Sequence, residues 1–263
     1  MIGHLLAAFQ RLFITRKSRV AVSLLIILTA AVPASEMLVL TLFSSLIIEG
    51  PQAFVDDPMG VAFKVGAVIV AFGLSRGTNH LVRLGRVRVY RDSFEEAGRV
   101  RTPSQESWEW ALAFELSSVL VSLVQVITFG ALILLVDWPT GILNGLATVV
   151  VLVLLSAIYY RQLDLQKGYV RTGNRAGSIA ISRRVGGRLR AAEFGAMLAS
   201  ISMVVVLLYM LIRTIGGDVD SADAIVLFLA LRLSSGQLTT LSASMMRFAR
   251  ASAREEGAVH HGG

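Results

Sequence analysis

The stretch that decides the fold is residues 223–250, which read DAIVLFLALRLSSGQLTTLSASMMRFAR. It begins as an apolar run, carries a charged residue inside that run, and then becomes rich in serine and threonine without a proline. Its polar positions are Arg232, Ser235, Thr239 and Ser242. These positions lie three and four residues apart, so they share one face of a helix. We therefore predict a membrane-spanning helix with one face turned away from lipid, because a lipid-facing helix would not be built this way.

The composition places the chain among integral membrane proteins. Hydrophobic residues make up 54% and charged residues 16% of the sequence, and the mean hydropathy is +0.67. The net charge of +7 does not indicate a nucleic-acid partner, because the basic residues lie in short segments between apolar runs. There is no cysteine, and the four histidines lack the spacing of metal ligands, so we expect no metal site.

We predict a six-helix transmembrane domain over residues 1–255 and a disordered tail over 256–263. An amphipathic helix over residues 2–16, followed by basic residues, is typical of a helix that lies in the membrane interface. The predicted spans are residues 20–48, 61–82, 110–136, 142–160, 191–215 and 223–246.

The charges of the connecting segments predict the orientation. Nearly all Lys and Arg lie in the N-terminus, the C-terminus and the segments that follow the second and fourth spans. The other three segments, among them an expected loop at residues 49–60, carry acidic residues with almost no basic ones. By the positive-inside rule, both termini are cytoplasmic, and we expect the protein in the inner membrane of a bacterium.

Polar residues within the spans are candidates for a substrate cavity, because such groups are costly in lipid. The third span repeats the spacing of the sixth, and the first span holds an acidic residue. The predicted cavity residues are Glu36, Glu115, Ser118, Ser122, Gln125, Arg232, Ser235, Thr239 and Ser242. Three alternatives stay open: hydroxyls that only join packed helices, a structural ion pair of Glu36 with Arg232, and a Glu115 that reaches the interface near Trp110.

Residues 233–237 read LSSGQ, one letter from the LSGGQ signature with which ABC ATPases contact nucleotide. That signature acts at a helix N-terminus, where free backbone N–H groups meet phosphate. Here the string follows an apolar run, and the sequence has no GxxxxGK[ST] phosphate loop. We interpret the match as coincidence and expect that the chain is not an ATPase, nor any other enzyme.

With this topology, the chain resembles the membrane half of an ABC exporter of the six-helix kind found in lipid-linked oligosaccharide flippases and peptide exporters. The helix before the first span is similar to that family's elbow helix. Residues 30–47, AAVPASEMLVLTLFSSLI, resemble its first helix and match Glu36 to an acidic position. Residues 230–253, ALRLSSGQLTTLSASMMRFARASA, resemble its sixth helix and match Arg232 and Leu233.

The resemblance implies a homodimer or a pseudo-symmetric heterodimer, surrounded by membrane lipids and coupled to a separate ABC ATPase subunit that would hold ATP and Mg²⁺. No cofactor is expected in this chain. Docking elements would lie near residues 96–106 and 172–182, and the docking candidates are Glu96, Arg99, Arg101, Arg175 and Arg183. The basic members also fit a role in topology or in contact with anionic lipid. The cytoplasmic segments 83–109 and 161–190 are short for this family.

We therefore expect a permease subunit of an ATP-driven exporter that works by alternating access. The alternative is a non-transporting six-helix anchor or assembly subunit, in which the polar faces are packing surfaces. A membrane-embedded enzyme is a third reading, but only Arg76 and His80 begin the convergent group that it requires.

Overall fold

The computed structural model describes residues 1–96, 103–172 and 181–259, which are almost entirely helical and include no strand. The helices are α1 (Ile2–Leu12), α2 (Arg16–Asp56), α3 (Pro58–Glu96), α4 (Pro103–Val136), α5 (Trp138–Thr172), α6 (Ile181–Ile215) and α7 (Ser221–Val259). Within these ranges, six helices, α2 to α7, are long and apolar enough to cross a membrane. The structure thus confirms an all-α protein with six such helices, as expected of a multi-pass membrane protein.

The six long helices extend beyond a bilayer core. The shortest has 34 residues and the longest has 41, which corresponds to about 50–60 Å of helix against ~30 Å of hydrocarbon. From the charged stripe after the second span, one expects its helix to continue out of the bilayer to about residue 101, and α3 continues in this way as far as Glu96. The cytoplasmic placement of residues 83–109 and 161–190 stays a prediction. The third helix continues to Glu96 and the fifth to Thr172, because leucine, valine and arginine there keep a helix-forming pattern through the charges.

The first acidic connection is much shorter than the predicted loop at residues 49–60. The second helix ends at Asp56 and the third begins at Pro58. The backbone N–H of Gly60 donates to Asp57 Oδ1 at 2.9 Å, so Asp57 caps α3 while Pro58 takes the first helical position. In place of the expected loop, the cap residue Asp57 is followed directly by Pro58, the first residue of α3.

Two predicted end points also move. The interfacial helix ends at Leu12 instead of residue 16, because Thr15 Oγ1 accepts the backbone N–H of Ser18 at 3.1 Å and caps α2. At the other end of the chain, α7 continues to Val259, so the helix reaches into the tail that was predicted to be disordered from residue 256.

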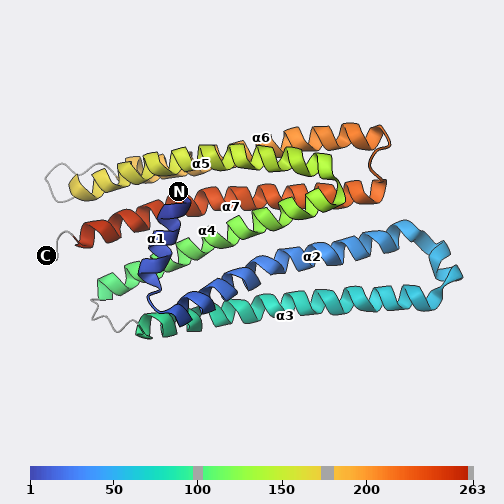
Figure 1. Ribbon diagram of the computed structural model, residues 1–263, viewed down its shortest axis with the longest axis horizontal. Helices are drawn as coiled ribbons and strands as arrows, with labels where there is room; N and C mark the ends of the chain where they lie inside the picture. Colours follow the sequence, from blue (N-terminus) through green and yellow to red (C-terminus); the bar gives the residue numbers. More distant parts are fainter. Residues whose placement is uncertain (97–102, 173–180, 260–263) are drawn as a thin grey trace.

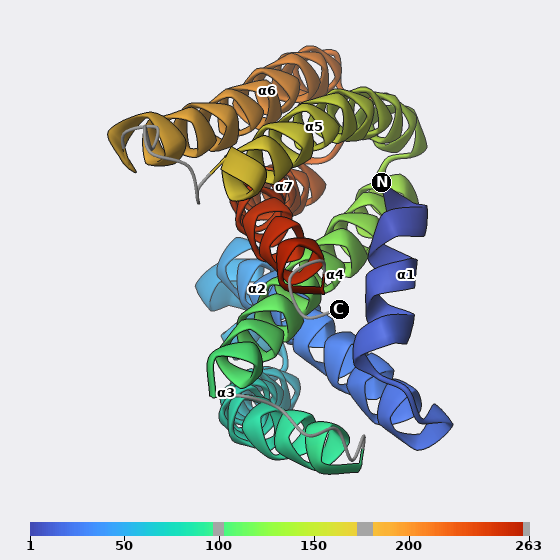
Figure 2. The same ribbon diagram turned by 90° about the vertical axis from the view of Figure 1, so that its left-hand side faces the viewer.

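The long helices run alongside one another in three layers of two (Figure 1). Viewed end-on, α5 and α6 form one layer, α4 and α7 the middle layer, and α2 and α3 the last (Figure 2). Both termini lie at one end, together with the C-terminal ends of α3 and α5. We name this the basic end and the opposite one, which holds Asp57, Asp137 and Asp218, the acidic end. Toward the acidic end, the α2–α3 pair spreads away from the other four long helices.

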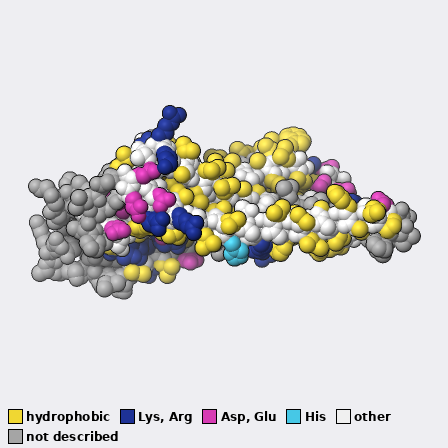
Figure 3. Space-filling model, turned by 90° about the horizontal axis from the view of Figure 1, so that it is seen from below, with side chains coloured by type: hydrophobic (Ala, Val, Ile, Leu, Met, Phe, Trp, Pro, Cys, Tyr) yellow, Lys and Arg dark blue, Asp and Glu magenta, His cyan; other side chains and the backbone are white. Residues whose placement is uncertain are grey.

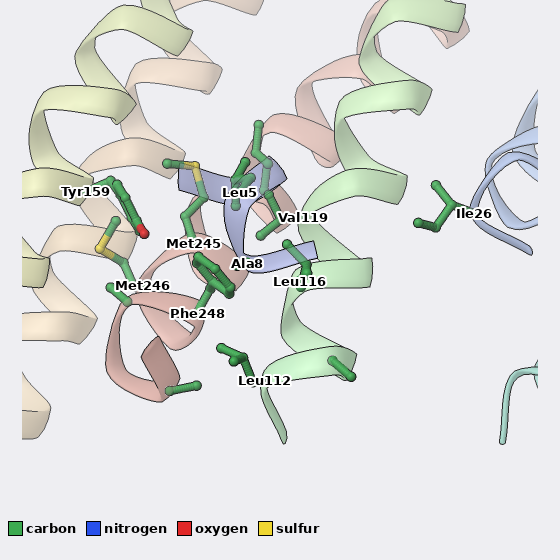
Figure 4. Close-up of a cluster of buried hydrophobic side chains, with 14 of the residues drawn as sticks. Leu5, Ala8, Ile26, Leu112, Leu116, Val119, Tyr159, Met245, Met246 and Phe248 are labelled. Atoms are coloured by element: carbon green, nitrogen blue, oxygen red, sulfur yellow. The ribbon is translucent and has the colours of Figure 1, made fainter. Parts of the chain in front are cut away.

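Helix α1 is built into the protein core at the basic end. Its Leu5 and Ala8 are buried and lie close to Leu116, Met245 and Phe248 of α4 and α7 (Figure 4). The opposite face of α1 exposes Ile2 and Leu6. The helix therefore joins α4 and α7 through one face and leaves an apolar face for the membrane interface.

Apolar side chains cover much of the described part of the face seen in Figure 3. On α3, Phe63 is 79% and Ile69 66% exposed, as expected of side chains that meet lipid. Only 6% of the apolar window of α3 is buried, against 44% for α7. Among the six long helices, α7 is thus the most enclosed and α3 the least.

Candidate functional site

Helix α7 keeps one polar face uncovered although its other faces are packed. The residues of this face, which we call the polar strip, are exposed or half-buried: Arg232, Gly236, Thr239, Ala243, Arg247 and Arg250. They recur every three or four positions and so lie in line along the helix. The strip extends from the middle of the apolar segment to the basic end, and an arginine facing lipid in mid-membrane is costly. It is therefore a surface for water, for another protein or for a ligand.

Only two of the four polar positions predicted on α7 belong to the polar strip. Arg232 and Thr239 lie on the exposed strip. The hydroxyl of Ser235 instead donates to the carbonyl of Ala199 in α6 at 3.3 Å, and that of Ser242 donates to the carbonyl of Ala192 at 3.0 Å. Two of the four positions thus join packed helices, which is the alternative that the sequence left open.

The predicted stripe of α4 meets the polar strip at its basic end. Arg247 Nε donates to both carboxylate oxygens of Glu115, at 2.8 and 2.9 Å. One turn further along α4, Ser118 is half-buried. Ser122 and Gln125 are 2% and 5% exposed. The α4 stripe is therefore open beside Glu115 and closed toward the middle of the bundle.

Glu36 has a different partner from the one suggested by the sequence. Its carboxylate lies 3.4 Å from the guanidinium of Arg76, because α2 and α3 form a hairpin that brings these residues together. Among the described residues, Arg232 makes no ion pair and its side chain is exposed. The hypothesis of a Glu36–Arg232 pair is thus replaced by a Glu36–Arg76 pair between α2 and α3.

A pocket of about 430 Å³ lies between α4, α6 and α7 at the basic end. Its polar lining comes from Glu115, Arg188, Arg247 and Arg250. Arg188 lies close enough to Arg250 to be repelled by its charge. At the same end, the guanidinium of Arg254 lies 4.2 Å from the ring centre of Trp108, which also lines the pocket. We name this cavity the arginine pocket.

Arg188 and Arg250 were not among the predicted site residues. Arg188 lies in the connecting segment after the fourth span, and Arg250 lies in the basic exit of the last span. The signal that could have found the second was present, since Arg247, Arg250 and Arg254 follow helical spacing on the same face as Arg232 and Thr239.

A second charged cluster, at the acidic end, ties two turns together. Arg213 Nη1 lies 2.5 and 2.6 Å from the two oxygens of Asp137, and Arg213 Nε lies 3.6 Å from Asp218. Burial alone would raise the pKa of Asp137. The hydrogen bonds from Thr140 and Arg213, with the charge of Arg213, outweigh burial and hold that pKa below its usual value. This cluster joins the α4–α5 turn to the α6–α7 turn.

The docking candidates stay predictions. Glu96 accepts hydrogen bonds from Thr15 Oγ1 at 3.1 Å and Lys17 Nζ at 3.2 Å, so it holds the start of α2 against the end of α3. Arg183 lies in α6, but its side chain is outside the described part of the structure. The others, Arg99, Arg101 and Arg175, lie outside the described residues altogether.

The LSSGQ string at residues 233–237 lies inside α7, where its backbone N–H groups are part of the helix. It therefore has none of the free N–H groups with which a helix N-terminus meets phosphate. Metal binding has no support either, since no group of three or more His, Asp or Glu among the described residues could hold an ion.

No protein family matches the chain in a comparison with family models, and no curated protein matches it. The likeness to ABC exporters therefore rests on the quoted stretches of sequence.

Proposed function

We propose that the chain is the permease subunit of an ATP-driven exporter, with ATP hydrolysis supplied by a separate subunit. The observation that carries this proposal is the polar strip, an exposed row of polar and small residues on the most enclosed helix. At 1.5 Å per residue, Arg232 lies about 16 Å from the start of α7, near mid-membrane. An arginine turned to lipid at that depth costs about 3 kcal/mol.

The polar strip avoids this cost if it faces water in a path between two subunits. A second copy, or a related subunit, that turns its own strip toward this one would enclose a passage with arginine and threonine in its wall. The basic end would then be cytoplasmic by the positive-inside rule. The hydroxyls and guanidinium groups would suit a polar or anionic substrate.

The helix layers offer two bodies that could move against each other. Helices α4 to α7 pack closely together, whereas α3 packs mainly on α2. The pair α2–α3 is held to the rest near the basic end and spreads from it toward the acidic end (Figure 1). In alternating access, groups of helices move against each other as rigid bodies. The group α4 to α7 and the pair α2–α3 are suited to that role.

Cysteine labelling tests whether the strip faces water. The chain has no cysteine of its own, so single substitutions Gly236→Cys and Thr239→Cys can be placed on an unmodified background. Matched controls are Val204→Cys and Leu208→Cys on α6, whose side chains are 63% and 60% exposed and apolar. In native membranes, a charged maleimide should label the strip positions rapidly and the control positions hardly at all, because the controls meet lipid.

The same variants separate transport from the alternative of a non-transporting anchor or assembly subunit. A strip used only for packing would be as poorly labelled as Val204→Cys, and that outcome would reject the water-lined path. For the exporter itself, purification from the host should recover an ATPase subunit, and Arg232→Gln should impair transport. If no ATPase co-purifies and Arg232→Gln leaves transport unchanged, the proposed function fails.

A further inference from the structure

The arginine pocket has a charge imbalance that the rest of the described chain does not correct. Three arginines face one carboxylate in its lining, which leaves a net charge of +2. Glu115 is already engaged through both oxygens by Arg247. Among the described residues, Arg188 and Arg250 have no acidic partner, and they repel each other. We propose that this pocket binds the phosphate group of an anionic membrane lipid.

Phosphate chemistry fits the two unpaired arginines. A phosphate diester offers oxygens that accept charge-assisted hydrogen bonds from two guanidinium groups at once, and its charge removes their mutual repulsion. Arg247 could remain on Glu115 while Arg188 and Arg250 take the ligand.

The position of the pocket favours a lipid over a free ion. Its residues lie within about ten positions of the basic ends of the apolar segments of α4, α6 and α7, where lipid headgroups are found. Trp108 lines the pocket there, and tryptophan is enriched at this level of the membrane. The pocket thus lies at the depth of the lipid headgroups, where a phosphate group belongs to a molecule that also carries acyl chains.

The walls of the pocket match the remainder of such a ligand. Apart from the charged groups and Trp108, the lining is aliphatic or methionine: Ala111, Val185, Leu189, Ala192, Ala243, Met246 and Ala251. The volume of about 430 Å³ falls within the range of sites that hold organic ligands, roughly 300–1,000 Å³. A phosphate ion alone would leave these apolar walls without contact. The inference does not depend on transport, because a lipid could occupy the pocket in a non-transporting protein as well.

Native mass spectrometry of the full chain in detergent tests the proposal, with phosphatidylglycerol and phosphatidylcholine as the probes. The wild-type protein should retain phosphatidylglycerol in preference to phosphatidylcholine. The double variant Arg188→Gln with Arg250→Gln should weaken this retention on the order of tenfold, since two charge-assisted donors are lost. The variant Arg188→Lys with Arg250→Lys keeps both positive charges and should retain most of the phosphatidylglycerol binding. It also shows whether the protein still folds when both guanidinium groups are removed.

The matched control removes two arginines at the same end of the protein but outside the pocket. Arg161 of α5 and Arg190 of α6 are exposed and do not line it, so Arg161→Gln with Arg190→Gln should bind phosphatidylglycerol as the wild type does. An equal loss in this control would mean a diffuse electrostatic attraction and would overturn the specific site. Equal retention of both lipids by the wild type, or displacement of phosphatidylglycerol by millimolar inorganic phosphate alone, would overturn the lipid assignment. None of these readouts requires transport, so the lipid site and the permease function can fail separately.

Discussion

The contact between α6 and α7 at Gly195 provides the sharpest test of the packing. A Cβ atom built at Gly195 would lie 2.1 Å from Ser242 Oγ, 2.8 Å from Ser242 Cβ and 2.5 Å from Leu155 Cδ2. Ser242 is fully buried and its hydroxyl is bonded to Ala192. The side chain therefore has no free space to turn into, and Gly195→Ala should force the helices apart.

The expected cost follows from two opposing effects. Overpacking a closely packed contact costs about 1–3 kcal/mol, whereas alanine stabilises a helix interior by up to about 1 kcal/mol relative to glycine. The net loss should be roughly 1–2 kcal/mol, visible as a lower apparent melting temperature of the purified protein in detergent. Gly186→Ala on the same helix is the control, because its Cβ would have nothing within 4 Å, and it should be neutral or slightly stabilising.

A second substitution makes the test specific to the contact. Ser242→Gly removes both atoms that the new Cβ meets on α7, at the expense of one interhelical hydrogen bond, roughly 0.6 kcal/mol in a membrane protein. The double variant should then be more stable than the sum of the single effects predicts, by about 1 kcal/mol. Additive effects, or Gly195→Ala as stable as Gly186→Ala, would refute the close approach of α6 and α7 at this point.

Two further predictions concern the ends of the bundle. Because the folded pKa of Asp137 lies below its ordinary value of 3.8, its contribution to stability is present above that value and is lost as the pH falls through the folded pKa. Asp137→Asn should therefore lower the melting temperature at neutral pH. The melting temperature of this variant should also fall less steeply as the pH is lowered. If it falls as steeply as that of the wild type, the ion pair of Asp137 with Arg213 is contradicted. At the basic end, Phe13 is 0% and Ile14 43% exposed. Phe13→Ala should cost about 3–5 kcal/mol and Ile14→Ala little, as measured by thermal unfolding. Equal effects would count against the burial of Phe13 in the connection between α1 and α2.

Much of the architecture could be read from the sequence because lipid imposes simple demands on a chain. Backbone groups in a bilayer must be satisfied within the helix, so long apolar runs could be assigned as helices without knowledge of their neighbours. The errors lay at the ends of helices. At residues 49–60 acidic residues looked like a loop, but Asp57 is a helix cap and Pro58 a first helical residue.

Candidate site residues were harder to predict, because helical spacing identifies a face but not what that face meets. The stripe at Arg232, Ser235, Thr239 and Ser242 lies on one side of α7 as predicted, yet α6 covers Ser235 and Ser242 and leaves the other two exposed. Which half is covered depends on the rotation of α7 against α6. That rotation is determined by contacts with residues some 36 to 50 positions away in the chain.

The sequence by itself thus determined the number of membrane-crossing helices, their approximate limits and the presence of a polar face on the last of them, because each depends on local hydropathy and periodicity. Only the tertiary structure decided that Glu36 pairs with Arg76, that Arg213 holds Asp137, and that arginines from α6 and α7 meet around one pocket. These are encounters between side chains on different helices, and the crossing and rotation of those helices come from packing that no single stretch of sequence contains.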